Sequence, residues 1–396
     1  MNVLKVVPTF YPAVWHGGPI LSVYSLCNAL VDRGIDLRVL TTARLDRRST
    51  IGPGFPARAQ AGYPIYYCRR KLGVSVAPAL PWQLWRLVRW ADVVHLTAVY
   101  SFPTIPTLLT CRILRKPVVW SPRGSLQRWE GSTRPRLKSV WDRICRFIAP
   151  GRLILHVTSE QEARESRKRF PGVEAAVIPN GVHVPDEVAH VENKATLRLL
   201  YIGRIDPKKG IENLLEACSE LDDRLPVPWS LRIAGSGEES YVGSIRRGIE
   251  DRRLSDRVSM LGHVVGEAKR ALFEETDVVV VPSHTENFAM VVAEALAHGV
   301  PVIASKGTPW EKVEEEGCGL WVDNSPEALA AAIEIIGRMP LRDMGSRGRE
   351  WMSREFGWHD RAGQMVEVYE KVGTLRGSEP PAQGAAARHS EAVSER

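Results

Sequence analysis

The stretch VVVVPSHTENFAMVVAEALAHGVPVIA, at residues 278–304, decides how this chain folds. Val278–Val281 is wholly apolar and predicts a buried strand. Met290–Ala297 has the composition of a buried helix, and Gly299 follows it where a left-handed residue commonly ends a helix. Residues 301–304 are apolar again and predict a second strand. Buried strands joined through a helix are typical of a parallel sheet that is covered on both faces.

The same alternation of strands and helices fills the rest of the chain in two blocks. Strands are predicted at residues 2–7, 37–41, 92–96, 117–121 and 154–158, and again at 197–202, 231–234, 258–260, 278–281 and 301–304. A polar stretch without periodicity separates the blocks, so we expect two doubly wound, Rossmann-like α/β domains at residues 1–188 and 196–355. We expect a helix at 356–375 to return to the first domain, and a disordered tail at 376–396.

Composition excludes several classes of protein. The 396 residues are 44% hydrophobic and 25% charged, which is ordinary for a globular chain and unlike a collagen, a disulfide scaffold or a disordered protein. No apolar run approaches the ~20 residues of a membrane span. The start, MNVLKVVPTF, lacks the features of a signal peptide, so we expect a cytoplasmic protein. None of the six cysteines forms a CxxC pair, which indicates reduced thiols.

Charge divides unevenly between the two halves. Residues 1–190 contain 27 Lys and Arg against 12 Asp and Glu, whereas residues 191–396 contain 26 against 34. A basic first half can attract nucleic acid, an anionic membrane or phosphorylated ligands.

Charged residues and glycines follow the predicted strands, at the sheet edge where α/β proteins bind ligands. Arg204 and Lys209 come between the strand at 197–202 and the next helix. A diphosphate would be held there by arginine as a fork and by lysine as a point charge, although a solvated basic loop would look the same. Gly17 and Gly18 follow the first strand, where glycines let the backbone approach a phosphate or simply form a turn.

Two glutamates follow the strand at Val278–Val281. If a helix begins near Asn287, Glu286 and Glu294 point to broadly the same side, about 12 Å apart along the axis. Glu294 lies within an apolar run, where a carboxylate needs a partner, and sugar hydroxyls are suitable partners. Free backbone N–H groups at residues 288–290 would form an anion site beside them. The alternative is a pair of surface glutamates on one helix.

These segments resemble one family. Residues 282–309, PSHTENFAMVVAEALAHGVPVIASKGTP, resemble the EX7E region of glycosyltransferase family 4, whose members are retaining transferases of GT-B architecture. Residues 203–210 resemble the GRxxxxKG element of that family, and Gly17-Gly18 its N-terminal glycine loop. Residues 121–126, SPRGSL, and 308–310 resemble loops of its exopolysaccharide and lipopolysaccharide members. One departure is Ala289, which stands where the family has glycine. The resemblance extends from the first strand to about residue 370.

The resemblance implies an α/β fold of the GT-B type, with two Rossmann-like domains facing each other across a cleft. It also implies roles for individual residues. Glu286 would contact the transferred sugar, Glu294 the ribose, and Arg204 and Lys209 the diphosphate. Backbone would line the donor at Gly17, Gly18, Asn287, Phe288, Ala289 and Met290. His95 is a candidate catalytic residue, or else a buried or capping histidine. No Asp-x-Asp motif is present, so we expect a retaining hexosyltransferase with no metal and no cofactor, and a nucleotide-diphosphate sugar as co-substrate.

The acceptor is expected on the first domain. Basic residues between 121 and 152 are interleaved with tryptophans, and the predicted acceptor or membrane face comprises Arg123, Arg128, Arg134, Arg136, Lys138 and Arg143. Basic residues with tryptophan suit an anionic membrane surface that carries a lipid-linked glycan. This predicts a peripheral enzyme of cell-surface polysaccharide synthesis on the inner face of the cell membrane. A packed helix with a solvated charged face is the alternative.

Three other functions are weaker. A non-hydrolysing nucleotide-sugar epimerase on the same architecture would need its own acid/base pair, and the basic half argues against it. A basic nucleic-acid-binding protein lacks an RNA-recognition, zinc-finger or helix-turn-helix signature, so no nucleic-acid partner is expected. A dehydrogenase would need G-x-G-x-x-G after the first strand.

Overall fold

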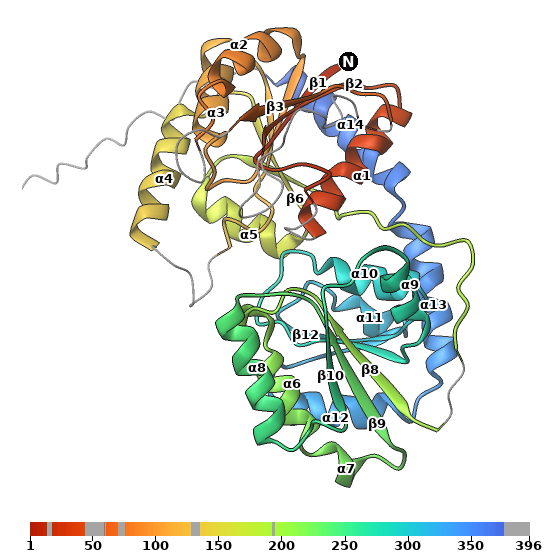
Figure 1. Ribbon diagram of the computed structural model, residues 1–396. Helices are drawn as coiled ribbons and strands as arrows, with labels where there is room; N and C mark the ends of the chain where they lie inside the picture. The colour runs from red at the N-terminus through yellow and green to blue at the C-terminus, as the bar shows by residue number, and fades with distance from the viewer. Residues whose placement is uncertain are drawn as a thin grey trace, which may run out of the picture.

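The computed structural model describes residues 1–13, 18–43, 59, 61–69, 76–127, 135–191 and 195–375. These residues form two α/β domains, one above the other in Figure 1, each built on one parallel sheet. The predicted tail at 376–396, Gly17, Arg128 and Arg134 lie outside the described residues.

The first domain contains a seven-stranded sheet with the order β3-β2-β1-β4-β5-β6-β7. Its strands are β1 (Asn2–Val7), β2 (Asp36–Ala43), β3 (Ile65–Arg69), β4 (Val93–Thr97), β5 (Val118–Ser121), β6 (Leu153–Val157) and β7 (Glu174–Val177). The strand order reverses direction between β1 and β4, which is the kind of position where open α/β sheets bind ligands.

The second domain contains a six-stranded sheet with the order β10-β9-β8-β11-β12-β13. Its strands are β8 (Leu197–Ile202), β9 (Trp229–Ala234), β10 (Val258–Gly262), β11 (Val278–Val281), β12 (Val302–Ser305) and β13 (Gly319–Val322). Here the order reverses between β8 and β11, so the loops after these two strands lie side by side.

Helices cover both faces of each sheet. In the first domain they are α1 (Gly18–Asp32), α2 (Leu80–Trp90), α3 (Thr104–Ile113), α4 (Pro135–Ile148) and α5 (Glu160–Arg169). In the second they are the 3-10 turn η2 (Pro207–Lys209), α6 (Ile211–Cys218), α7 (Leu221–Arg224), α8 (Glu239–Asp251), α9 (Gly266–Glu274), α10 (Met290–Ala297), α11 (Lys312–Glu315), α12 (Pro326–Ile336) and α13 (Leu341–Glu355).

The last helix, α14 (Trp358–Thr374), leaves the second domain and packs on the first, as Figure 1 shows in blue. Its residues Met365, Tyr369 and Val372 are buried in the core that α1 forms with the first sheet. Helices α2 to α5 pack on the opposite face of that sheet. The first domain therefore takes its core from both ends of the chain.

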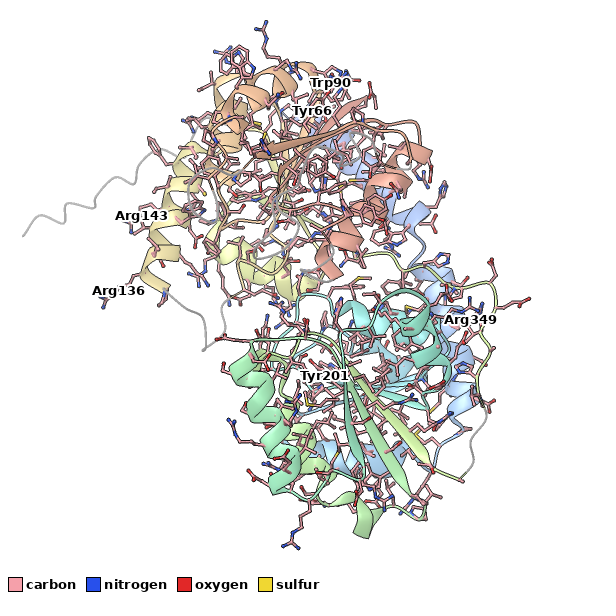
Figure 2. The ribbon with its side chains drawn as sticks, in the orientation of Figure 1. Tyr66, Trp90, Arg136, Arg143, Tyr201 and Arg349 are labelled. Atoms are coloured by element: carbon pink, nitrogen blue, oxygen red, sulfur yellow. The ribbon has the colours of Figure 1, made fainter. Side chains whose placement is uncertain are left out.

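The two connections between the domains lie side by side. Val182 forms a bridge with Gly357, and Val182 N donates to Phe356 O at 2.8 Å. A Cβ at Gly181 would lie 2.5 Å from the Trp358 ring, so only glycine fits there. Arg349 of α13, labelled in Figure 2, donates to the carbonyls of Pro185 and Asp186 and so ties this part of the connection to the second domain.

Three strands were not expected from the sequence. These are β3 (IYYCR), β7 (EAAV) and β13 (GLWV), and each lies at an edge of its sheet. An edge strand needs no continuous apolar run because part of it stays accessible to water, so its pattern is weak. The six cysteines are buried and free, as expected.

Candidate active site

The loops after β8 and β11 bring a lysine and a glutamate together. Lys209 Nζ forms an ion pair with Glu286 Oε1, and Ser283 Oγ donates to the same oxygen at 3.0 Å. The two side chains are only 19% and 13% exposed. Two of the predicted site residues, far apart in the chain, thus lie in contact at the carboxyl ends of adjacent strands.

Backbone contacts fix these two loops against each other. The Asp206 side chain accepts from Lys208 N at 3.0 Å and caps the short turn that carries Lys209. Gly210 follows with φ +63°, and a Cβ there would lie 2.1 Å from Pro282 O. His284 N donates to Lys208 O at 2.9 Å. The glycine of the GRxxxxKG element is therefore required for the β8 loop to touch the β11 loop.

Arg204 lies on the β8 loop with Lys209, and Glu294 lies on the helix that follows Glu286. Arg204 is exposed just beyond β8, where its carbonyl accepts from Tyr201 Oη at 2.7 Å (Figure 2 labels Tyr201). Glu294 is in the middle of α10 and pairs with Lys269 Nζ of α9 at 2.7 Å. Its side chain is 25% exposed, so the carboxylate reaches solvent while holding its cation. The partner that the sequence required for Glu294 is supplied within the protein by Lys269.

Helix α10 spans Met290–Ala297, as predicted, so it does not begin near Asn287 and Glu286 lies outside it. Ala289 adopts a left-handed conformation with φ +59° and ψ +67°, which no α-helix contains. Phe288 is buried against Trp310 and Phe356, and Trp310 Nε1 donates to the Phe288 carbonyl. These contacts turn the chain before the helix, so its first free N–H groups follow Ala289.

Asn287 reaches the first domain. With its amide nitrogen turned toward the Glu162 carboxylate, where it meets acceptors, it donates to Glu162 Oε2 at 2.6 Å and to Thr158 Oγ1 at 3.0 Å. Glu162 is on α5 and Thr158 directly follows β6. This contact holds the loop that carries Glu286 and Asn287 against the first domain.

His95 lies inside the first domain, in a buried row of hydrogen bonds. Its Nδ1 is 2.6 Å from Tyr369 Oη, its Nε2 is 2.6 Å from Ser121 Oγ, and Ser121 Oγ is 2.7 Å from His156 Nδ1. His156 Nε2 must donate to the Ile178 carbonyl at 3.1 Å. With both rings neutral, this fixes the direction of the other three hydrogen bonds. Tyr369 Oη donates to His95 Nδ1, His95 Nε2 donates to Ser121 Oγ, and Ser121 Oγ donates to His156 Nδ1.

Burial lowers the pKa of His95 and His156 well below 6.5, and nearby Lys5 and Arg123 lower it further. Both ring nitrogens of His95 are engaged by protein groups, so in this arrangement neither is free for a substrate. The buried-histidine interpretation fits this geometry, and the catalytic interpretation does not.

Arg123 is not on the predicted surface face. Its Nη1 donates to Asn180 Oδ1, and its Nε and Nη2 are buried without a partner among the described residues. Burial lowers the pKa of its guanidinium. Arg123 and Gly124 have φ +53° and +75°, and in this turn the Arg123 side chain reaches Asn180. Its assignment to the acceptor or membrane face is therefore corrected.

Three of the other basic residues predicted for that face are on α4. Arg136 and Arg143 are exposed and project outward from α4 in Figure 2, whereas Lys138 is half-buried with Nζ 5.4 Å from the Tyr100 ring centroid. Gly18 is the first residue of α1.

The sequence interpretation missed Glu162 and Lys269. Glu162 follows Ser159 by three residues, a spacing that indicates helix capping and gives no hint of an interdomain contact. Lys269 stands in a charged segment of the kind usually found on a protein surface. Neither residue stands in a motif, and only the fold brings it to the site.

The described residues lack both a metal-binding cluster and a membrane-spanning helix. They contain no group of three or more His, Cys, Asp or Glu side chains arranged to hold a metal ion. None of their helices has the length and apolar character needed to cross a bilayer.

Comparison with known proteins agrees with this architecture. Glycosyltransferase Family 4 matches residues 16–184, and Glycosyl transferases group 1 matches residues 186–351. The phosphatidyl-myo-inositol mannosyltransferase of Mycobacterium leprae is 28% identical, over 90% of this chain and 94% of that protein. The GDP-mannose:cellobiosyl-diphosphopolyprenol alpha-mannosyltransferase of Xanthomonas oryzae pv. oryzae is 27% identical, over 93% and 96%.

Among solved structures, HepE of Anabaena in complex with UDP and glucose superposes with a TM-score of 0.74 at 18% identity, covering 94% of this chain and all of that one. Two Rossmann-like domains with this likeness to HepE show the GT-B architecture. With both halves matched in order, the chain belongs to glycosyltransferase family 4.

Proposed function

We propose that this enzyme moves a hexosyl group, with retention and without a metal, from a nucleotide-diphosphate sugar to a lipid-linked glycan in cell-surface polysaccharide synthesis. The observation that carries the proposal is the Lys209–Glu286 pair beside the first turn of α10. It places a cation, a sugar-binding carboxylate and free backbone N–H groups together at the strand ends, which suits a sugar diphosphate.

The donor half of the reaction follows from these charges. Lys209 and Arg204 would neutralise the diphosphate as the bond from the anomeric carbon to the leaving phosphate oxygen breaks. Glu286 would then be released from Lys209 to accept from sugar hydroxyls. Glu294, held by Lys269, would accept from the ribose hydroxyls.

Retention follows if the acceptor attacks on the same face that the phosphate leaves. The acceptor oxygen forms the new bond to the anomeric carbon, and its proton passes to the leaving phosphate oxygen. No protein base is needed on that face, which agrees with His95 being occupied within the fold. The protein acts mainly by positioning and by stabilising charge.

The proposal of a lipid-linked acceptor and an anionic inner membrane surface rests on α4. Leu137, Val140, Ile144 and Phe147 recur at helical spacing and are 59%, 51%, 42% and 73% exposed. Arg136 and Arg143 flank this stripe. An exposed apolar face bordered by basic residues fits a helix lying in the interface of an anionic membrane. Both full-length relatives are named for acceptors that are lipids or lipid-linked.

A donor panel tests the function directly. GDP-mannose, UDP-glucose and ADP-glucose, each with its free nucleotide, would be compared by thermal stabilisation and by transfer to membrane extracts. A ligand that binds the folded state raises the melting temperature by mass action. We expect one nucleotide to stabilise the protein strongly, and stabilisation by none would contradict the proposal.

A further inference from the structure

Glu162 lies in the first domain, but one of the donors around its carboxylate comes from the second. The side chain is fully buried and accepts from Gly124 N at 2.5 Å, Thr158 N at 2.8 Å and Thr158 Oγ1 at 3.1 Å. The Asn287 amide adds a further donor at 2.6 Å. An ionised carboxylate has about four acceptor sites, so Glu162 is saturated only when Asn287 is in place.

Helix capping does not explain this arrangement. Ser159 is the N-cap of α5, and its hydroxyl accepts from Glu162 N at 3.1 Å. In a capping box the glutamate would return to the backbone N–H of the cap residue itself. Here it bonds instead to Thr158, one residue earlier, and to Gly124 on another loop. The carboxylate thus joins two loops of the first domain and is aimed at the second.

The backbone is shaped to admit Asn287. Gly124 has φ +75°, and a Cβ on it would lie 3.0 Å from Asn287 Cβ and 3.2 Å from Gln127 Oε1. A side chain at this position would strain the turn and push the Asn287 loop away. The glycine of the SPRGSL segment therefore serves the contact between the domains.

The contact acts on the residues of the reaction through Asn287. Asn287 directly follows Glu286, whose backbone N donates to Gly307 O at 2.8 Å, and it precedes the first turn of α10. On the other side, Arg123 joins the Gly124 turn to Asn180 in the interdomain connection. Hydrogen bonds on both sides of the Arg123–Gly124 turn therefore link Asn180 to Asn287, the residue that follows the proposed sugar-binding glutamate.

We propose that Glu162 is a positioning residue that receives the Asn287 amide when the domains close, and so fixes the loop carrying Glu286 for transfer. Glu162 touches neither substrate. Through this contact, the loop that carries Glu286 is fixed only when the first domain has closed on the second. Transfer to the acceptor is then favoured over hydrolysis of the donor, because closure excludes water. The kinetic part of this inference rests on the proposed function.

The test replaces the amide by a carboxylate. Asn287→Asp keeps the size of the side chain and places a second negative charge within hydrogen-bonding distance of Glu162. We expect the domains to separate, so that small-angle scattering of the free protein gives a larger radius of gyration than for wild type. We also expect kcat for transfer to fall roughly tenfold to a hundredfold, the range for one lost charge-assisted bond.

The reciprocal exchange distinguishes a contact from general damage. Glu162→Gln in the Asn287→Asp background supplies an amide to the new carboxylate, so the double variant should recover part of the lost kcat and the smaller radius. Glu160→Gln, exposed on the same helix, serves as the control and should match wild type in both measurements. Nucleotide affinity should stay close to wild type in Glu162→Gln, because Glu162 is not in the donor domain.

Either of two outcomes overturns the inference. Asn287→Asp could keep both the wild-type radius and the wild-type kcat, or the double variant could be no better than the single variants in either measurement. The scattering comparison does not depend on catalysis. An absence of transfer from every donor would therefore contradict the proposed function, while the contact would still be decided by the radius.

Discussion

Lys209 and Glu286 neutralise each other in a mostly buried site. Replacing either residue therefore leaves the charge of the other unpaired. Lys209→Ala and Arg204→Ala should each reduce transfer roughly tenfold or more, because a charge-assisted contact to phosphate contributes about 1.5–3 kcal/mol. Steady-state kinetics and calorimetry with the nucleoside diphosphate check this. Lys306→Ala, which removes an exposed pair with Asp323, is the matched control. Wild-type turnover in both site variants would contradict the assigned role.

The two glutamates of the EX7E region should separate by what they bind. Glu294→Gln keeps the shape but weakens hydrogen bonds to ribose hydroxyls, so affinity for the free nucleotide should fall. Glu286→Gln should leave that affinity close to wild type and lower the rate of transfer. Calorimetry and kinetics on the same preparations decide between them. The opposite pattern would mean that the two roles are exchanged.

At the scale of residues, the sequence predicts what its motifs contain and misses what only folding brings together. The ends of β8 and β11 can be predicted from their apolar runs. Lys209, Glu286 and Glu294 could therefore be assigned from the sequence to the segments that follow those two strands. Glu162 and Lys269 were missed because their partners are far away in sequence. Arg123 was misplaced because net charge says nothing of which way a turn directs a side chain.

At the scale of elements, Gly210 allows two strand-end loops to touch. Gly210→Ala would add a Cβ 2.1 Å from Pro282 O at φ +63°, and should lower the free energy of unfolding by more than 2 kcal/mol, roughly the upper end of strain at a left-handed residue. Gly262→Ala is the control, with φ +72° but no atom within 4 Å, and should cost about 1 kcal/mol. Denaturant unfolding compares the two. Equal losses would show that the contact with Pro282 does not matter.

Helix α4 should bind anionic membranes through both its apolar stripe and its arginines. Replacing Leu137, Ile144 and Phe147 with Ser should abolish flotation with liposomes of anionic lipid at every salt concentration. Replacing Arg136 and Arg143 with Ser should weaken binding mainly at low salt, by about 1 kcal/mol per residue.

Ile335→Ser is the control for these variants, because Ile335 is 55% exposed on α12 of the other domain. If wild type ignores anionic liposomes at low salt, the acceptor is a soluble molecule and α4 has another partner.

Element boundaries were readable where strands are buried on both faces. The run of valines in β11 and the apolar strand β1 were predicted at their observed positions. The edge strands β3, β7 and β13 were not, because partial exposure removes the continuous apolar pattern. The bounds of α10 were predicted at Met290–Ala297, but the left-handed conformation of Ala289 was not, although the family has glycine at that position.

At the scale of the whole molecule, the neutral histidine row ties α14 to the first sheet and should make stability depend on pH. The native pKa of His156 lies well below its ordinary value of 6.5, so the unfolded chain takes up the proton first. Stability should therefore be complete above pH 6.5 and fall below it, by up to about 1.4 kcal/mol per pH unit for each such histidine.

Urea unfolding at pH 7 and pH 5.5 measures this slope. His156→Gln should flatten it, whereas His183→Gln, at an exposed position, should leave it unchanged. His95 contributes in the same direction, and Lys5 and Arg123 are the charged groups that oppose protonation of both rings. An unchanged slope in His156→Gln would contradict the neutral row.

The return of α14 makes the second domain an insertion within the first. Strand β1 is inside the first sheet, and α14 is fastened to the same body by Arg152 Nη1 donating to Gly373 O at 2.9 Å and by the Lys371–Glu174 pair. Both ends of the described chain therefore belong to the first domain. The distance between fluorophores attached at these two ends would not change if the domains moved apart. The second domain leaves the first and rejoins it at adjacent points. It could be exchanged for the corresponding domain of a relative by two cuts, without disturbing the core of the host.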